Sequence, residues 1–175
     1  LNSDCGLYSE VPAGKYAVDF VGDNSSFIGG VVYGQNLPAS LAVRQDGVRF
    51  SATSSNCTLQ GTHVYGFFAK GLHSSNADGV GIGVNDLGVG NRIDKCKISG
   101  KFCVNLSGKN GYVTNSVISN EYLSSSEPKP WNDTSNYWDG ICGENMRGYL
   151  VEGNVVYENG QSGIYTGGNN GYSFD

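Results

Sequence analysis

Two similar stretches of the sequence place a carboxylate beside a glycine, where acid–base chemistry is conceivable. Asp78 lies in "SNADGVGI" and Asp139 in "WDGICG", and in both the aspartate precedes Gly and an apolar residue. Glu144 follows in the stretch after Asp139. Hydrolysis of a glycosidic bond needs two carboxyl groups, about 5 Å apart for retention or roughly 6.5 to 9.5 Å apart for inversion. Asp139, Asp78 and Glu144 are therefore the candidate catalytic residues, although Asp before Gly is also a common turn residue.

Aromatic side chains gather just before Asp139. Both tryptophans of the chain, Trp131 and Trp138, lie with Tyr137 in "NEYLSSSEPKPWNDTSNYWDG" (120–140). Aromatic faces stack on the apolar faces of sugar rings, and loops on a rigid scaffold are where binding residues concentrate. These three residues are predicted to bind substrate. The alternative is that their rings pack the loop onto the rest of the protein.

Basic residues suggest a second chemistry. Arg147 is a candidate substrate-binding residue, and a basic cluster precedes it in the sequence (Arg92, Lys95, Lys97, Lys101 and Lys109). A polysaccharide lyase would use a Lys or Arg base, with Ca²⁺ held on aspartates such as Asp86 and Asp94 to neutralise a uronate. Alternating Lys also fits the solvated face of a strand. The two histidines, His63 and His73, lack a third ligand, so no metal site is predicted.

Composition excludes several classes of partner. The chain has 175 residues and a net charge of −5, which argues against binding to nucleic acid. No stretch of 18 apolar residues occurs, so no membrane span is expected. The five cysteines include no CxxC pair and are predicted to be reduced interior fillers, which favours a virion protein made in the cytosol over a secreted one. No cofactor is predicted, apart from Ca²⁺ if the chain is a lyase.

The elements that position these residues are indicated by an internal repeat. Segments 77–100, 101–120, 138–160 and 161–175 each begin with a short strand, pass through Gly and Asn, and continue into an alternating strand. Their alignment makes Ile98, Ile118 and Val156 equivalent, and likewise Ile93, Val113 and Val151. An earlier match sets "NCTLQG" (56–61) on "KCKISG" (95–100), with Cys57 on Cys96 and Leu59 on Ile98.

A unit of about 20 to 24 residues, made of short strands with Gly or Asn at the corners, is typical of one coil of a parallel β-helix. The sequence predicts a single all-β region over residues 1–175, with loop inserts near 62–76 and 121–137. Neighbouring coils lie about 4.8 Å apart, so Asp78 and Asp139, two coils apart, would be separated by roughly 10 Å. A lean of the side chains would close that gap to an inverting distance.

The stretch "VPAGKYAVDFVGDNSSFIGGVVYG" (11–34) resembles the first coil of the pectate-lyase-like superfamily, where a "PxGxY" strand precedes a strand ending in "IxGG". The resemblance implies a right-handed parallel β-helix. Because the helix that caps that family's open end is missing here, and the sequence stops inside a coil, a piece of a longer protein is expected. The sequence is also weakly similar to polygalacturonase-like hydrolases, which use three catalytic aspartates. Asp78 matches one of them, but Lys101 and Phe102 stand where that family has two aspartates, so only one catalytic carboxylate carries over.

The function that fits best is the shaft of a phage tailspike, or a similar depolymerase of bacterial surface polysaccharide, placed in the virion tail. Such spikes are usually trimers, so a homotrimer is expected. Asp139 would pair with Asp78 or Glu144, and Trp131 and Trp138 would hold the sugar. Two alternatives stay open, namely a secreted polysaccharide lyase or epimerase, and a structural or adhesive β-helix without turnover.

Overall fold

Every regular element in the described part of the protein is a β-strand, as predicted. The computed structural model describes residues 6–9, 16–34, 46–67, 82–100, 102–119, 139–143, 146–159 and 162–166. Within these ranges the strands form three parallel sheets, each named here after one of its strands. Nothing in these ranges is a helix long and apolar enough to cross a membrane.

Each sheet takes one strand from every coil. The β2 sheet contains β2 (Tyr16–Phe20), β5 (Asp46–Phe50), β8 (Ile82–Asp86), β11 (Phe102–Leu106), β14 (Asp139–Cys142) and β17 (Ser162–Tyr165). The β3 sheet contains β3 (Ser26–Ile28), β6 (Thr58–Gln60), β9 (Arg92–Asp94), β12 (Tyr112–Thr114) and β15 (Leu150–Glu152). The β4 sheet contains β1 (Gly6–Ser9), β4 (Val31–Gly34), β7 (His63–Phe67), β10 (Lys97–Gly100), β13 (Val117–Ser119) and β16 (Val155–Tyr157).

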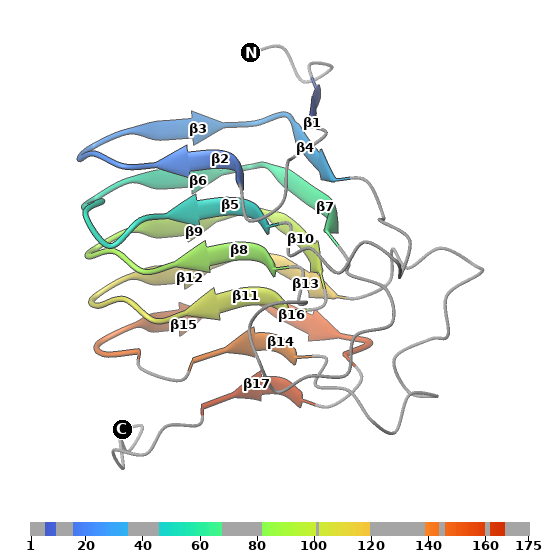
Figure 1. The fold of residues 1–175 in the computed structure, drawn as a ribbon. Coiled ribbons are helices and arrows are strands. Elements are labelled where there is room, and N and C mark those ends of the chain that lie inside the picture. The colour runs from blue at the N-terminus through green and yellow to red at the C-terminus, as the bar shows by residue number, and fades with distance from the viewer. Residues whose placement is uncertain are drawn as a thin grey trace, which may run out of the picture.

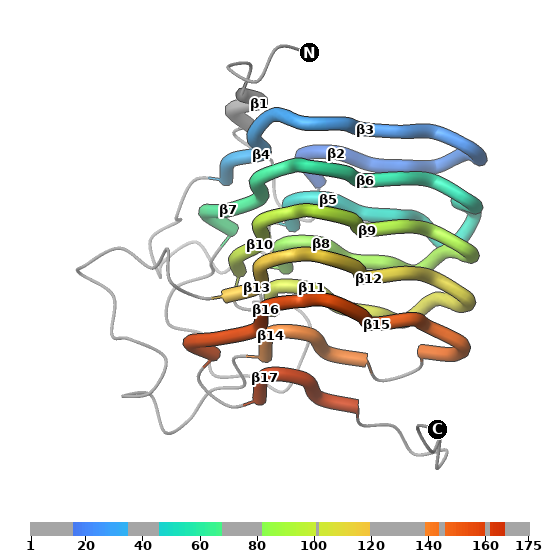
Figure 2. The backbone as a smooth tube through the Cα atoms, turned by 180° about the vertical axis from the view of Figure 1, so that it is seen from behind, coloured from blue at the N-terminus to red at the C-terminus, as the bar shows by residue number. Residues whose placement is uncertain are grey.

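The chain winds through the sheets in a fixed order. It passes along the β2 sheet, turns into the β3 sheet, turns again into the β4 sheet and then begins the next coil (Figure 1). Viewed from the N-terminal end, the chain turns clockwise as it moves away, which makes the coil right-handed (Figures 1 and 2). The predicted right-handed parallel β-helix is confirmed.

Left-handed backbone conformations turn two of the three corners. Positive φ values occur between the β2 and β3 sheets and again between the β3 and β4 sheets. At eight of these ten positions the backbone N–H bonds to the next coil, as from Asn56 to the Val89 carbonyl at 2.9 Å. Gly and Asn tolerate this conformation best. The residues are Asn24, Asn56, Gly90, Asn110 and Gly148 at the first corner, and Gly29, Gly61, Lys95, Asn115 and Gly153 at the second. Gly and Asn therefore turn these two corners as predicted, with Lys95 as an exception, and Glu158 has a positive φ at the third corner, after β16.

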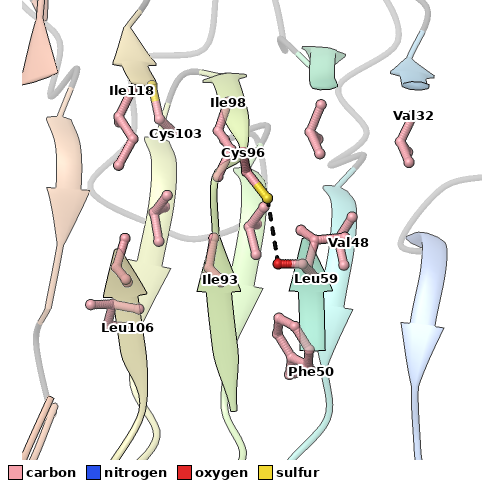
Figure 3. Close-up of a cluster of buried hydrophobic side chains, with 14 of the residues drawn as sticks. Val32, Val48, Phe50, Leu59, Ile93, Cys96, Ile98, Cys103, Leu106 and Ile118 are labelled. Carbon is pink, nitrogen blue, oxygen red and sulfur yellow. Dashed lines mark hydrogen bonds between the residues drawn. The ribbon is translucent and has the colours of Figure 1, made fainter. Parts of the chain in front are cut away.

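Apolar side chains stack coil upon coil inside the tube (Figure 3). Ile98 pairs with Ile118 in register, and Ile118 with Val156, as the repeat predicted. The column of Ile93, Val113 and Val151 is likewise confirmed. Ile93, Ile98, Val113 and Ile118 are at most 1% exposed, whereas Val151 and Val156 are only partly buried. Burial of such columns is the main force that holds the coils together.

The predicted match of Cys57 with Cys96 is wrong. Leu59 pairs with Ile93 in the β3 sheet, and the partner of Ile98 is Val64 on β7. The two aligned stretches belong to different sheets, because each coil contains two corners that are both followed by a short strand of similar pattern. Consequently residues 63–67, predicted to lie in a loop insert, form β7, and any insert there begins after Phe67.

The cysteines fill the interior as predicted. Cys57, Cys96, Cys103 and Cys142 are all buried and form no disulfide with one another, while Cys5 lies outside the described residues. Burial raises the pKa of the Cys96 thiol to about 11 and that of Cys103 to about 12. These two thiols therefore stay neutral and behave as small apolar groups at physiological pH.

Candidate functional site

The longest intervals between strands all attach to one edge of the tube. The chain leaves the β4 sheet and re-enters the β2 sheet across residues 35–45, 68–81 and 120–138, whereas the other two corners take few residues. We call this the loop-bearing edge; it comprises the ends of β4, β7, β10, β13 and β16 and the starts of β5, β8, β11, β14 and β17. Rigid strands that support long connections are a common setting for binding and catalysis.

Most of the predicted site residues belong to these intervals. Trp131, Tyr137 and Trp138 precede β14, and Asp78 precedes β8, so all four attach to the loop-bearing edge but lie outside the described residues. Glu144 follows β14 and is also outside them.

Asp139 is the predicted catalytic residue that the structure describes. It is the first residue of β14 and is 2% exposed. Its register partner is Ser162 on β17, whose hydroxyl and backbone N–H both bond to the carboxylate. The other oxygen, Oδ1, has no hydrogen-bond partner among the described residues. Burial raises the pKa of Asp139, while the two bonds from Ser162 act in the opposite direction. An incompletely bonded, shielded carboxyl group of this kind suits proton transfer.

The same sheet provides an internal comparison for Asp139. Asp46 begins β5 and is also followed by Gly and an apolar residue. It is 1% exposed, and its Oδ1 accepts the backbone N–H of Ile82 in the next coil at 3.0 Å. An aspartate at the start of a strand thus has a structural role here, namely to bond the following coil. Asp139 shares that role and also accepts the Ser162 hydroxyl, while its Oδ1 has no hydrogen-bond partner among the described residues.

Two neighbours complete the surroundings of Asp139 that the structure describes. Gly140 follows it, and a Cβ there would lie 2.6 Å from the Gly163 carbonyl oxygen and 2.7 Å from Asn159 Nδ2, so a larger residue would push the coils apart. Cys103 on β11 is close enough for the Asp139 charge to add to the rise in the pKa of its thiol, which burial mainly causes. The thiol is therefore neutral beside the carboxyl group.

Arg147 lies away from Asp139. It is exposed in the corner between the β2 and β3 sheets, where its backbone forms a parallel β-bridge with Lys109 of the preceding coil. That corner follows the C-terminal end of β14, whereas Asp139 begins the strand at the loop-bearing edge (Figure 1). The structure does not bring these two predicted site residues together.

Comparison with known proteins gives two matches. A tail spike protein from Salmonella phage epsilon15 is 50% identical over 177 aligned residues, which cover 98% of this chain and 16% of that protein. The crystal structure of the Dettilon tailspike protein superimposes with a TM-score of 0.85 at 55% identity, over 99% of this chain and 32% of that chain. The homologues of the present chain are thus phage tailspike proteins. No family model matches the sequence.

These tailspike relatives agree with the predicted fold and location. Tailspikes are components of the virion tail, which is where the sequence analysis placed this chain. The high TM-score means that the described coils follow the path of a tailspike β-helix. The chain spans about a third of the solved tailspike and about a sixth of the phage epsilon15 protein.

The two aspartates proposed as calcium ligands do not share a site in the tailspike fold. Asp86 points into the tube, where its Oδ1 accepts Asn91 Nδ2 at 2.9 Å and its Oδ2 accepts the Tyr149 hydroxyl at 2.8 Å. Asp94 instead bonds along the β3 sheet to Gln60, at 2.8 Å. Across the described ranges, no group of three His, Cys, Asp or Glu residues is placed to hold a metal ion. The interior network of Asp86 was not predicted, because no local pattern shows that a tyrosine two coils later reaches back to it.

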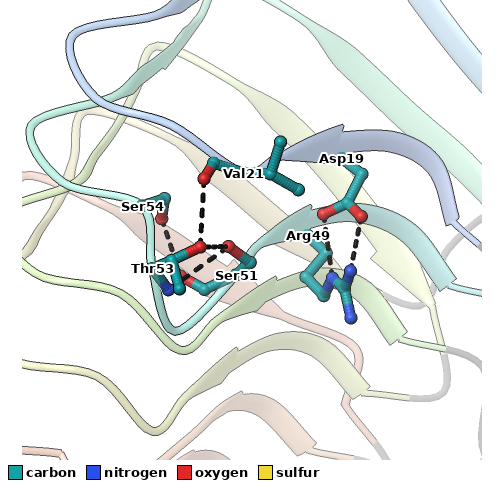
Figure 4. A network of polar contacts seen from close by, with 6 residues as sticks. All are labelled: Asp19, Val21, Arg49, Ser51, Thr53 and Ser54. Atoms are coloured by element: carbon teal, nitrogen blue, oxygen red, sulfur yellow. Dashed lines mark hydrogen bonds and ion pairs between the residues drawn. The ribbon is translucent and has the colours of Figure 1, made fainter.

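A second feature missed by the sequence analysis lies on the outer face of the β2 sheet (Figure 4). Arg49 forms two bonds to the Asp19 carboxylate, one of them from Nε to Oδ1 at 2.8 Å. The guanidinium also lies 3.9 Å from the centre of the Tyr16 ring. The Asp19 hydrogen bond is the main cause of a raised Arg49 pKa. Because both side chains are partly exposed, this pair contributes mainly to the alignment of the first two described coils of the sheet.

Proposed function

We propose that this chain is part of a homotrimeric tailspike that binds a bacterial surface polysaccharide and hydrolyses it at the loop-bearing edge. The proposal rests first on the tail spike protein of a Salmonella phage, because a phage tail must engage the surface of a bacterium. It rests secondly on the concentration of Trp131, Tyr137, Trp138 and Asp78 in the intervals that attach to this edge.

The catalytic part of the proposal rests on one observation, namely the surroundings of the Asp139 carboxyl group. Its carboxyl group is buried, its pKa is raised by that burial, and Oδ1 has no partner in the described structure. A raised pKa keeps a proton available closer to neutral pH, which is what a general acid in glycoside hydrolysis needs. We assign Asp139 that role, with the proton delivered from its carboxyl group to the oxygen of the leaving sugar.

A second carboxylate must activate the water. Asp46 is unsuited, because it lies three coils from Asp139 in the same sheet, roughly 14 Å away. Asp78, which precedes a strand two coils from β14, is our candidate for this role, and Glu144, which follows the other end of β14, is the alternative. The residue in line with Asp139 two coils away is Ile82, four residues after Asp78 in the sequence, so the predicted equivalence of Asp78 and Asp139 is wrong and the coil spacing does not fix the distance between them.

The sugar chain would be held by stacking. Trp131, Trp138 and Tyr137 are assigned to sugar rings next to Asp139, where an aromatic face covers the apolar face of a ring. Arg147 is assigned to a more distant contact, which is made only if the glycan extends across the β2 sheet to the corner at Lys109.

The function is tested by incubating the assembled spike with a broad panel of capsule and O-antigen polysaccharides. Chain length is followed by size-exclusion chromatography, together with reducing ends and ultraviolet absorbance. Shortening with new reducing ends and no unsaturated product is expected. Unsaturated, ultraviolet-absorbing products would replace hydrolysis by a lyase reaction. Binding without shortening on every glycan would make the chain an adhesin and would refute the depolymerase proposal.

A further inference from the structure

We propose that Ser162 is a positioning residue for Asp139, holding one oxygen of its carboxyl group so that Oδ1 is directed to the reacting bond. The inference rests on the catalytic role proposed for Asp139. Ser162 is on β17, the neighbouring strand of the same sheet, and is in register with Asp139.

The contact is made from one side of the carboxyl group. The hydroxyl and the backbone N–H of Ser162 both donate to Asp139, and Oδ1 has no partner among the described residues. Two donors from one residue fix the plane of a carboxyl group better than one donor does, because rotation would break both bonds. At 2% exposure the group has little competing water. Asp139 is thus held in one orientation with a free oxygen.

The matching aspartate earlier in the sheet shows that the hydroxyl is not needed to close the coil. Asp46 bonds the next coil through the backbone N–H of Ile82, at 3.0 Å, and the side chain of Ile82 is apolar. The Asp-Gly-apolar start of a strand therefore forms whether the residue beside the aspartate on the next strand is Ile82 or Ser162. The Ser162 hydroxyl adds an interaction that the Ile82 side chain cannot make to Asp46.

The Ser162 hydroxyl also lowers the pKa of Asp139, against the larger effect of burial. Burial raises the pKa of Asp139, and the bonds from Ser162 lower it, since donors favour the ionised carboxylate. Among the described residues, the titratable group that faces Asp139 from another strand is Cys103 on β11. That thiol has a pKa raised to about 12 and carries no charge at neutral pH. Loss of the hydroxyl should therefore raise the pKa of Asp139 further, with no nearby charge to compensate.

The test compares three variants of the assembled spike. Ser162→Ala should lower kcat about tenfold, as expected for one lost hydrogen bond, with KM unchanged. It should also move the alkaline limb of the kcat profile to higher pH, by roughly half a unit to one unit. Ser162→Thr keeps the hydroxyl, so its kcat and the position of its alkaline limb should be those of the wild type. Ser119→Ala is the matched control, because it removes a buried hydroxyl that has no partner among the described residues. It should change neither kcat nor the alkaline limb of the profile.

A second measurement separates this inference from the proposed function. Infrared titration of the Asp139 carboxyl band, assigned by its loss in Asp139→Asn, needs no substrate. A higher midpoint in Ser162→Ala than in the wild type supports the contact even if no glycan is cleaved, in which case the proposed function alone fails. An unchanged midpoint, or a pH profile in Ser162→Ala identical to that of Ser119→Ala, overturns the inference.

Discussion

Asp94 gives the sharpest prediction about stability, because its charge is held by donors from two neighbouring coils. Its Oδ2 accepts Gln60 Nε2 at 2.8 Å from the coil before. Its Oδ1 accepts Thr114 Oγ1 at 2.8 Å and Asn115 Nδ2 at 3.1 Å from the coil after. The change to test is Asp94→Asn. The amide keeps one acceptor but presents its own N–H₂ group where a carboxylate oxygen was.

The magnitude follows from the pKa of Asp94. The bond from Gln60 is the largest cause that lowers it, followed by the bond from Asn115, and together with smaller effects they bring it from 3.8 to about 2. A shift of that size corresponds to roughly 2 kcal/mol. Because Asp94 keeps 7% exposure and water partly screens its charge, we expect about 1 to 2 kcal/mol. That predicts a fall in the unfolding midpoint of roughly 2 to 8 °C.

The pH dependence supplies the critical assay. Since the folded state lowers the pKa of Asp94, its contribution is fully present above pH 3.8 and is lost as the pH falls through about 2. Far-ultraviolet circular dichroism, at a fixed heating rate from pH 2 to 6, should show wild type and Asp94→Asn converging near pH 2. Glu152→Gln is the control, because Glu152 is an exposed residue two coils on from Asp94 in the same column of the sheet. A difference between wild type and Asp94→Asn that stays constant across this range would refute the reasoning.

Two further substitutions test the corner and the interior. Gly148→Ala should lower the free energy of unfolding by about 1 to 2 kcal/mol, because Gly148 has a φ of 64° and a Cβ there would lie 2.5 Å from Asn110 Oδ1. Gly22→Ala, with nothing within 4 Å of its Cβ, should be nearly neutral in the same denaturant titration. Tyr149→Phe should cost about 1.5 to 3 kcal/mol, because it removes a donor from the buried Asp86 carboxylate. Tyr112→Phe, at an exposed ring, should cost little, and equal losses in the two tyrosine variants would argue against the interior bond.

The repeat made much of the fold predictable. Ile98, Ile118 and Val156 could be aligned because inward positions on successive coils need similar apolar volumes, and Gly or Asn recurs where the backbone is left-handed. The alignment failed at Cys57 because two corners of one coil are followed by strands of similar composition, so local similarity does not reveal which sheet a strand joins. Lys95 shows that a corner is also formed without Gly or Asn when backbone bonds to neighbouring coils fix it.

The candidate site was less predictable. Asp139 could be identified from its Asp-Gly-apolar pattern, but the same pattern at Asp46 was not singled out, although it forms an equivalent contact with the next coil. Ser162 could not be found from the sequence, since its role depends on the register between β14 and β17. Arg147 was grouped with Asp139 through its nearness in sequence, whereas the strand and corner between them carry it to another edge.

The most direct test of the central claim is a comparison of Asp139→Asn with Asp46→Asn in polysaccharide depolymerisation by the assembled spike. Asp139→Asn should lower kcat by about 10² to 10⁴ through loss of the general acid. Its unfolding midpoint at neutral pH should equal or exceed that of the wild type, because a buried carboxyl group with a raised pKa loses stability when it ionises. Asp46→Asn should leave kcat within about twofold. Full activity in Asp139→Asn, or an equal loss in both variants, would contradict the account.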